Sequence, residues 1–145
     1  MTDRNEQLKC MLSDVIYNGL DKEKREVITG KYKDITLNDM HIIDRIGLNQ
    51  AKNMSAVAKE IGVTTGTLTI AVNNLVKKGY LYRERSDRDR RVVLVSLTEK
   101  GIRAYRHHKR FHDKMMMELI EGFEEEEIPV LMKALGRIQE FMQEE

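Results

Sequence analysis

The sequence predicts a mainly α-helical protein that carries one small β hairpin. Apolar side chains recur every three or four residues along most of the 145-residue chain, which is the period of amphipathic helices. Pro129 is the one proline, and so low a proline content fits a chain that is mostly helix. Between residues 80 and 97 this period is lost, and two short runs rich in aromatic and β-branched residues favour strands.

Two helices are expected before the centre of the chain. Between residues 6 and 28, helical spacing joins the apolar residues Leu8, Met11, Leu12, Val15, Ile16 and Leu20. Residues 30–34 break the pattern. Thr36 then fits the cap of a second helix, which ends near Gly47 and has Met40 and Ile43 on its inner face.

Two shorter helices joined by a tight turn follow over residues 55–77. Ala58 is small enough for two helices to approach closely, and Gly62 tolerates the positive φ that the turn needs. Ile61 and Val63 are expected to fill the space between the helices. Thr64 or Thr65 can cap the second helix, whose outer face carries short polar groups that suit base edges and phosphates.

The hairpin completes the pattern of a DNA-binding fold. Strands at residues 80–85 and 92–97 flank a tip that contains three arginines and two aspartates, one of which is expected to orient an arginine. Helix, turn, helix, strand, arginine-rich tip and strand is the order of a winged helix-turn-helix, which mainly reads double-stranded DNA. The second helix would enter the major groove and the arginines a narrow minor groove. The expected DNA contacts are Ser55, Thr64, Thr65, Gly66, Thr67, Thr69, Asn73, Lys77, Arg88, Arg90 and Arg91.

An ordinary helical hairpin with a solvated, charged turn is the simpler interpretation of these residues. The distribution of charge favours DNA binding instead. Residues 77–110 carry twelve basic and four acidic side chains and residues 111–145 carry three and ten, so the net charge of +1 hides two opposite regions. A positive field confined to the hairpin and the helices beside it is expected of a protein with one DNA-binding face.

The apolar stripes of the two terminal segments predict a homodimer. A long helix is expected after Thr98, and the carboxylates of residues 124–127 favour the start of another. A small winged domain cannot cover these stripes, whereas a second copy can, and a two-fold dimer also suits a palindromic operator. Packing within a monomer is the alternative. The expected organisation is a single domain over 1–145, with dimerisation helices at 1–34 and 98–145 and a DNA-binding core at 35–97 whose wing lies near 80–97.

Composition argues against several other classes of protein. The chain shows no signal peptide and no apolar run long enough to span a bilayer, so no membrane partner is expected. A single cysteine fits the reducing cytoplasm. The sequence offers neither a glycine-rich phosphate loop nor a nucleophile beside its histidines, so neither an enzyme nor a cofactor is expected.

Residues 78–101 resemble the wing signature of the MarR family of transcription regulators. The matching positions are Gly79, Asp89, Arg90, Arg91, Leu97 and Thr98. The resemblance extends over the helical arms on both sides of the winged core. It implies a dimeric regulator, usually a repressor, whose DNA affinity is set by a small ligand, a metal or oxidation. It also implies that Arg90 or Arg91 enters the minor groove.

Within this family the chain is similar to the FabT-type repressors of bacterial fatty-acid synthesis genes. The similar segments are residues 40–47, 63–80, 107–115 and 121–128. This resemblance implies a palindromic promoter operator of lipid-synthesis genes. It further implies a co-repressor, which is a long-chain acyl group carried on acyl carrier protein.

An acyl chain needs a narrow apolar cavity, which methionine and isoleucine can line because they adapt to a flexible chain. The junction of the first, second and long fifth helices is the expected place, although each residue there could simply fill the core. The candidate lining residues are Leu12, Val15, Ile16, Ile28, Met40, Ile43 and Tyr105. A basic cluster that could dock an acidic carrier protein, or merely be a solvated surface, comprises Lys22, Lys24, Arg25, Lys31 and Lys33.

The histidines leave a zinc-responsive regulator as an alternative. His108 and His112 lie four residues apart on one helix face, a spacing that can chelate a metal. MarR-type zinc regulators draw ligands from this helix and from a histidine of the second helix, where His41 has a comparable place, and Glu23 is a weaker candidate. Hydrogen-bonded histidines are the simpler interpretation, so no metal is assigned. Cys10 could sense oxidants, but we expect it to be a small buried apolar residue of the first helix.

Overall fold

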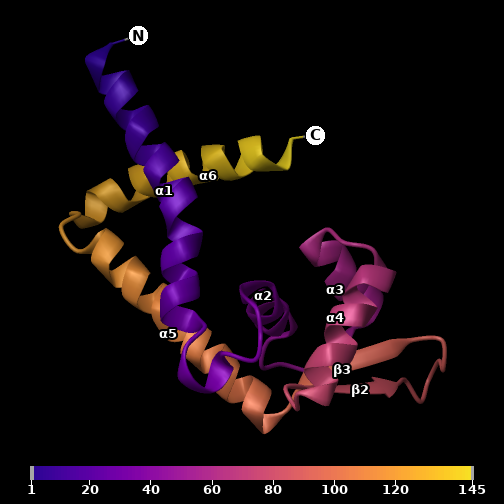
Figure 1. The fold of residues 1–145 in the computed structure, drawn as a ribbon. Helices are drawn as coiled ribbons and strands as arrows, with labels where there is room; N and C mark the ends of the chain where they lie inside the picture. Colours follow the sequence, from indigo (N-terminus) through magenta and orange to yellow (C-terminus); the bar gives the residue numbers. More distant parts are fainter. Residues whose placement is uncertain (1, 145) are drawn as a thin grey trace. The chain divides into compact units, whose positions relative to one another are not determined.

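The computed structural model describes residues 2–144 and has the predicted mainly helical architecture with a small sheet (Figure 1). The helices are α1 (Asp3–Val27), α2 (Leu37–Ile46), α3 (Met54–Ile61), α4 (Thr65–Lys77), α5 (Glu99–Ile120) and α6 (Ile128–Gln143), with short 3-10 helices η1 (Gly30–Tyr32) and η2 (Glu125–Glu127). The strands are β1 (Lys52–Asn53), β2 (Leu81–Arg85) and β3 (Val93–Leu97). The described residues form two compact units, which divide between Phe111 and His112.

Local capping interactions set the ends of α2. The Thr36 hydroxyl accepts a hydrogen bond from the Asp39 backbone N–H at 3.1 Å, and the Asp39 carboxylate accepts one from the Thr36 N–H at 2.9 Å. This reciprocal capping box satisfies two donors that the first helical turn leaves without partners. At the other end Gly47 has a φ of 69°, which stops the helix where the sequence predicted.

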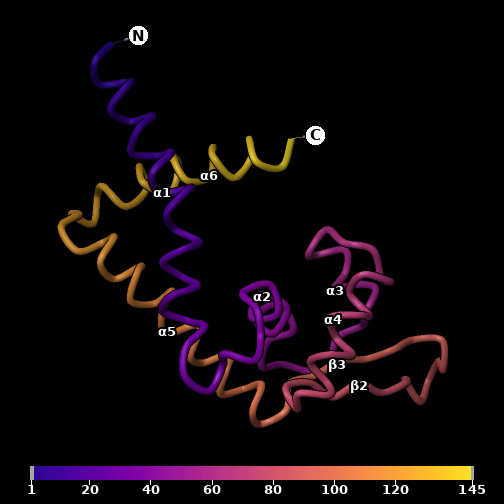
Figure 2. The backbone as a smooth tube through the Cα atoms, in the orientation of Figure 1, coloured from indigo at the N-terminus to yellow at the C-terminus, as the bar shows by residue number. Residues whose placement is uncertain are grey.

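The helix-turn-helix is formed by α3 and α4, which Figure 2 shows as two short helical tubes next to the hairpin. Asn53 caps α3 by accepting from the Ser55 N–H at 2.8 Å. Gly62 ends α3 with a φ of 82° and donates to the Ala58 carbonyl at 2.9 Å. Thr64, rather than Thr65, caps α4, because its hydroxyl accepts from the Thr67 N–H at 3.1 Å.

The sheet contains a strand that sequence reasoning missed. Its order is β1–β3–β2 and both pairings are antiparallel, with Arg83 opposite Val95 in the wing. The missed strand β1 adds Lys52 opposite Val95 and Asn53 opposite Leu94. Two residues are too few to show the alternation by which a strand is recognised, so only the pairing with β3 defines this one.

The core of the first unit lies between α2, the helix-turn-helix, the sheet and the start of α5. Its buried residues include Met40 and Ile43 of α2, Val57 of α3, Leu68, Val72 and Leu75 of α4, Tyr80, Val95 of β3 and Ala104 of α5. Val63 was expected to fill the space between α3 and α4 but is 37% exposed, because the turn carries it to the surface. Cys10 was expected to be buried but is exposed on α1.

Close backbone packing at Tyr80 joins the wing to α5. The Thr98 hydroxyl donates to the Gly79 carbonyl at 2.6 Å and accepts from the Gly101 N–H at 3.1 Å, while the Thr98 N–H donates to the Tyr80 carbonyl at 3.0 Å. A Cβ atom at Gly101 would overlap the Tyr80 carbonyl, so this approach requires glycine. The junction therefore fixes the angle at which α5 leaves the sheet.

The second unit contains the end of α5, η2 and α6. Here the Glu124 N–H donates to the Glu127 carboxylate at 2.9 Å, and Pro129 lies in the first turn of α6, where a proline costs no hydrogen bond. Several large apolar side chains of α6 are exposed, namely Val130, Met132, Leu135, Phe141 and Met142. Across residues 2–144, none of the helices has the length and hydropathy that crossing a bilayer requires.

Candidate nucleic-acid interface and buried histidine cluster

The polar side chains at the start of α4 are held by hydrogen bonds within the helix. The Thr64 hydroxyl donates to the Thr67 hydroxyl at 2.9 Å, and the Thr69 hydroxyl donates to the Thr65 carbonyl at 2.7 Å. All the predicted DNA contacts except Thr69 and Asn73 are exposed, and those two are half-buried. The threonines therefore present fixed orientations to a ligand, with fewer rotamers to lose on binding.

Gly66 leaves the outer face of the first turn of α4 open. A Cβ atom placed there would meet only the Thr64 hydroxyl, at 4.0 Å, among atoms of the protein. A glycine in a helix costs about 0.5–1 kcal/mol relative to alanine, and nothing inside the protein requires it at this position. The open face therefore fits close approach by another molecule.

A hydrogen bond between α4 and the wing is the contact that sequence reasoning missed. Arg83 of β2 donates from Nη1 to the side-chain amide oxygen of Asn73, Oδ1, at 2.6 Å. The bond fixes the orientation of the Asn73 amide and ties the middle of α4 to the sheet. No sequence signal singles out Arg83, because the wing contains several arginines and only the fold brings this one to α4.

The arginines of the wing tip differ in their hydrogen-bond partners. Arg91 forms a forked ion pair with Asp89, with Nε and Nη2 each 3.1 Å from a carboxylate oxygen. These hydrogen bonds hold the pKa of Asp89 below its ordinary value. The expectation that an aspartate orients a tip arginine is thus confirmed. Arg88 and Arg90 have exposed side chains, and the Arg90 carbonyl accepts from Arg85 Nη1 at 3.1 Å.

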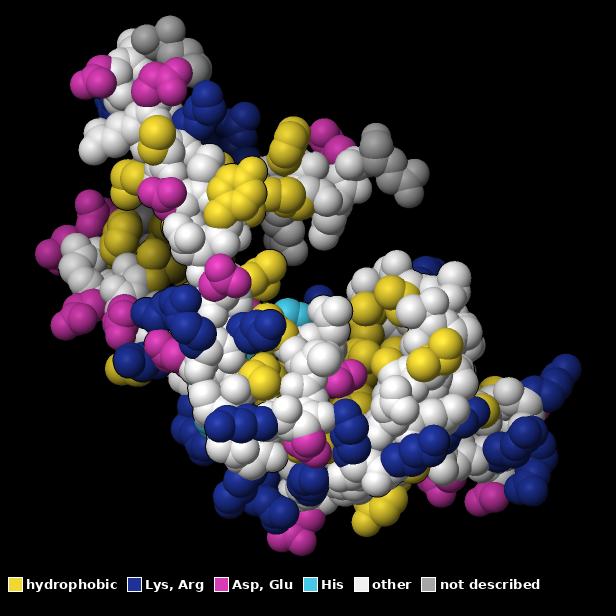
Figure 3. Space-filling model, viewed as in Figure 1, with side chains coloured by type: hydrophobic (Ala, Val, Ile, Leu, Met, Phe, Trp, Pro, Cys, Tyr) yellow, Lys and Arg dark blue, Asp and Glu magenta, His cyan; other side chains and the backbone are white. Residues whose placement is uncertain are grey.

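Positive side chains gather at the hairpin beside α4. Figure 3 shows lysine and arginine side chains covering the tip of the hairpin. Between residues 77 and 110 the excess is twelve basic over four acidic side chains. A helix with a fixed polar face beside an arginine-rich hairpin can bind a duplex in adjacent grooves.

Comparison with known proteins identifies this arrangement. A family model described as "Transcriptional regulator SarA/Rot" matches residues 24–107. FabT of Streptococcus pneumoniae, whose crystal structure was solved in complex with DNA, is 41% identical, with a TM-score of 0.87 and 96% of this chain and 97% of that chain covered. The chain belongs to this family of winged-helix transcriptional regulators of the MarR type.

Two curated relatives of the regulator come from Bacillus subtilis. The HTH-type transcriptional regulator YcgE is 36% identical over 104 residues, covering 68% of this chain and 65% of YcgE. YhjH is 26% identical over 124 residues, covering 83% of this chain and 67% of YhjH. The regulator thus spans about two thirds of the length of each. These relatives are transcriptional regulators rather than enzymes, which agrees with the sequence expectation.

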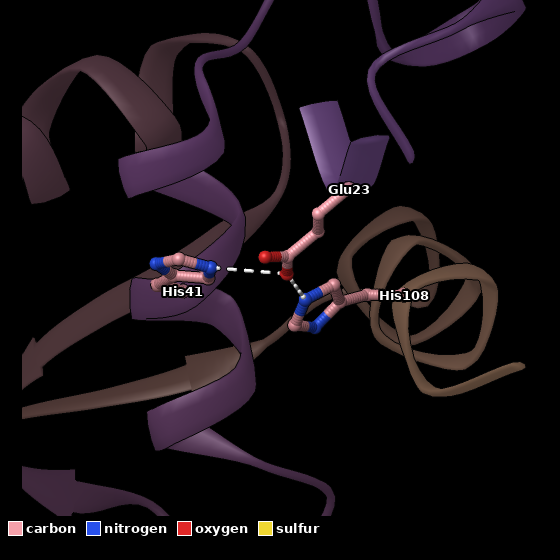
Figure 4. Close-up of side chains that lie close together, drawn as sticks. All are labelled: Glu23, His41 and His108. Carbon is pink, nitrogen blue, oxygen red and sulfur yellow. Dashed lines mark hydrogen bonds and ion pairs between the residues drawn. The ribbon is translucent and has the colours of Figure 1, made fainter. Parts of the chain in front are cut away.

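A cluster of titratable groups, in which Glu23 and His108 are buried and His41 is half-buried, joins three helices of the first unit. Glu23 of α1 accepts from His108 of α5 at 2.6 Å and from His41 of α2 at 3.1 Å, both through the same carboxylate oxygen, Oε1 (Figure 4). One potential ligand atom from each of the three residues lies within 4.8 Å of the others. Sequence reasoning named both histidines but gave Glu23 little weight. His112, the third histidine of that set, belongs to the second unit.

The electrostatic environment of His108 favours its charged form. Burial alone lowers the pKa of an imidazole, but the carboxylates of Asp44 and Glu23 outweigh it and raise the pKa of His108 above its ordinary value. Asp44 Oδ1 lies 3.5 Å from His108 Nδ1. Protonated His108 of α5 can therefore bridge the carboxylates of Glu23 on α1 and Asp44 on α2. This bridge holds α1 and α5 against α2.

The residues predicted to line a ligand cavity divide into two sets. Met40 and Ile43 are fully buried in the core, and Ile28 and Tyr105 pack against it. Leu12, Val15 and Ile16 are exposed on α1, at 40%, 69% and 44%. Met40 and Ile43 therefore fill the core in this structure, whereas Leu12, Val15 and Ile16 are open to solvent.

Gly66→Ala should stabilise the free regulator and weaken its binding to DNA. Removing a helical glycine raises the free energy of unfolding by about 0.5–1 kcal/mol, whereas the added methyl group holds α4 away from base edges. Thermal melting and fluorescence anisotropy with an operator duplex measure the two effects. Gly19→Ala on α1, where an added Cβ meets nothing within 4 Å, is the matched control. A destabilised Gly66→Ala protein would show that the glycine serves the fold.

Arg90→Ala should weaken binding to duplexes of any sequence and reduce the salt dependence. Loss of one cation per subunit lowers the slope of log K against log salt by about one unit per subunit. The measurement is anisotropy over a range of salt concentrations. Lys9→Ala, which removes an exposed cation of α1, should leave the slope unchanged. Equal slopes for Arg90→Ala and the unmodified protein would remove Arg90 from the interface.

Proposed function

We propose that this protein is a homodimeric repressor of fatty-acid synthesis genes that binds a palindromic operator in the cytoplasm. A long-chain acyl group on acyl carrier protein acts as its co-repressor. The observation that carries the proposal is the 41% identity to S. pneumoniae FabT along 96% of the chain. The sequence resemblance to FabT-type repressors supplies the target genes and the co-repressor.

The proposed mode of DNA recognition follows from the geometry of the first unit. The open, polar start of α4 enters the major groove, where Thr65, Gly66 and Thr67 face the base edges. Arg90 reaches the minor groove beside it, and Arg91 is held by Asp89. Because Arg83 ties Asn73 to the wing, α4 and the hairpin bind as one body.

The dimer is proposed to bury the apolar side chains that one copy leaves exposed. Exposed residues of α1 include Leu8, Met11, Val15 and Leu20, and α6 exposes Leu135 and Phe141. Burial of apolar surface stabilises association by roughly 25 cal/mol per Å², so two such stripes can hold a dimer. Two copies related by a two-fold axis present two α4 helices to two half-sites of a palindrome.

Replacing Leu135 and Phe141 together by glutamate should convert the dimer to a monomer. Charged side chains at an apolar interface are costly unless they are paired, so association should be lost at micromolar concentration. Light scattering measures the mass, and circular dichroism checks that the helices persist. Lys133→Glu, an exposed position of α6 that is already polar, is the control and should stay dimeric. A dimeric double variant would place the interface elsewhere.

The co-repressor is proposed to bind at the junction of α1, α2 and α5. Exposed Leu12 and Ile16, with half-buried Ile28 and Tyr105, offer apolar surface to an acyl chain. The exposed lysines and arginine between Lys22 and Lys33 offer positive charge to an acidic carrier. The hydrogen bonds of Glu23 with His41 and His108, called the Glu23 bridge below, lie at this junction. They connect α1 and α5 to α2, which packs on α3. An acyl chain there can therefore bias the position of the helix-turn-helix.

The co-repressor is tested by anisotropy with a palindromic duplex from a fatty-acid synthesis promoter at fixed salt. Hexadecanoyl-acyl carrier protein should tighten binding by about tenfold, within the range of known couplings, and the bare carrier should not. Lys24→Glu with Arg25→Glu should abolish the response and leave unassisted binding unchanged. Specific DNA binding with no response to the acylated carrier would disprove the co-repressor while keeping the regulator.

A zinc-responsive regulator is the second candidate, favoured by the Glu23–His41–His108 cluster. Imidazole nitrogen and carboxylate oxygen are zinc ligands, and three of them already lie within 4.8 Å of one another. Calorimetric titration of the chelator-treated protein with Zn²⁺ tests this candidate, with Mg²⁺ as the control. Binding that is lost in His41→Gln with His108→Gln, and that changes operator affinity, would support it. No heat of binding would exclude it.

A further inference from the structure

One side chain of α4 has no explanation within the protein. Leu68, Val72 and Leu75 form the buried face of the helix, at 1%, 0% and 0% exposure. Successive residues of an α-helix are turned by about 100°, so Ile70 lies on the opposite side from Leu68 and Val72. Ile70 is 69% exposed and is the one large apolar side chain of the fully described helix α4 that faces solvent.

The surroundings of Ile70 complete an outward-facing surface. Gly66 lies one turn before it, with open space where a side chain would be, and Lys77 lies two turns after it. Asn73, three residues on, is bonded to Arg83. Thr67 and Thr69 have hydrogen-bond partners inside the helix. The centre of this outward-facing surface is therefore occupied by an aliphatic side chain, Ile70.

The chemistry of the major groove offers one counterpart to such a group. Each base pair presents donors and acceptors there, but only thymine presents a methyl group, at C5. A β-branched aliphatic side chain has a slightly lower helix propensity than leucine or alanine and gains nothing in water, so its use at this position fits an apolar contact outside the protein. The open space at Gly66 allows the helix backbone to come close enough for that contact.

We propose that Ile70 contacts the C5-methyl group of a thymine in each operator half-site and sets specificity at that base pair. This inference rests on the proposed function as an operator-binding regulator. The polar groups of α4 then position the helix on the duplex, and Ile70 distinguishes thymine by burying one methyl group. Since the dimer uses α4 twice, the preferred thymine recurs symmetrically in both half-sites.

The test exchanges thymine for uracil, which removes the methyl group and leaves the base-pairing edge intact. A duplex is first selected from a random pool by the unmodified protein. Each thymine of one half-site is then replaced by deoxyuridine, and the dissociation constant is measured by anisotropy. One position should weaken binding about fourfold, the factor that corresponds to one buried methyl group. Both half-sites changed together should give roughly the square of that factor.

The variant Ile70→Ala decides whether this side chain is responsible. It should bind more weakly than the unmodified protein and should no longer distinguish uracil from thymine at that position. Leu48→Ala, which shortens an exposed aliphatic side chain outside α4, should keep the full uracil effect. Circular dichroism confirms that both variants are folded.

The outcomes separate the inference from the proposed function. If the unmodified protein enriches no sequence over a random duplex, the operator-binding function itself is wrong. If it selects an operator but no uracil position weakens binding, or if Ile70→Ala keeps the uracil effect, the thymine contact is overturned. A uracil effect that disappears only in Ile70→Ala establishes the contact.

Discussion

Tyr80 is fully buried at the point where four parts of the first unit meet. Its backbone carbonyl accepts from Thr98, and its hydroxyl donates to the Asp34 carboxylate at 2.7 Å, across 46 residues of sequence. The Lys100 ammonium lies 4.2 Å from the centre of its ring. Burial, reinforced by Asp34, raises the pKa of Tyr80 above its ordinary value. The end of α4, the wing, the start of α5 and the segment before α2 all depend on these contacts.

This constraint makes DNA recognition a property of one rigid surface. Because Tyr80 fixes the base of the wing and Arg83 ties the wing to Asn73, the hairpin and α4 cannot rotate independently. The hydrogen bonds from Thr64 to Thr67 and from Thr69 to the Thr65 carbonyl also orient these side chains before DNA binds. A surface so preorganised loses little conformational entropy on binding, so sequence discrimination can depend on small groups such as a single methyl.

The Glu23 bridge is the place at which we propose that the same surface is regulated. It holds α1 and α5 to α2 through one carboxylate oxygen that serves two histidines. Under either proposal, an acyl chain packed beside this bridge or a metal that replaces its hydrogen bonds would alter how α1 and α5 hold α2. The acyl and zinc proposals therefore share one site, the Glu23 bridge, and differ in the ligand that would change it.

The sequence by itself determined the features that depend on interactions within a few residues. Thr36, Gly47 and Gly62 set helix ends through contacts no more than four residues away, and helical spacing identified the buried face of α2. The cap of α4 was narrowed to Thr64 or Thr65 in the same way. The wing and the pairing of Asp89 with Arg91 are local in the same way.

Only the tertiary structure decided the contacts between distant segments. Glu23 meets His108 across 85 residues, β1 exists only through its pairing with β3, and the exposure of Ile70 depends on which face of α4 the core covers. No local period encodes such meetings, because they follow from how whole elements pack.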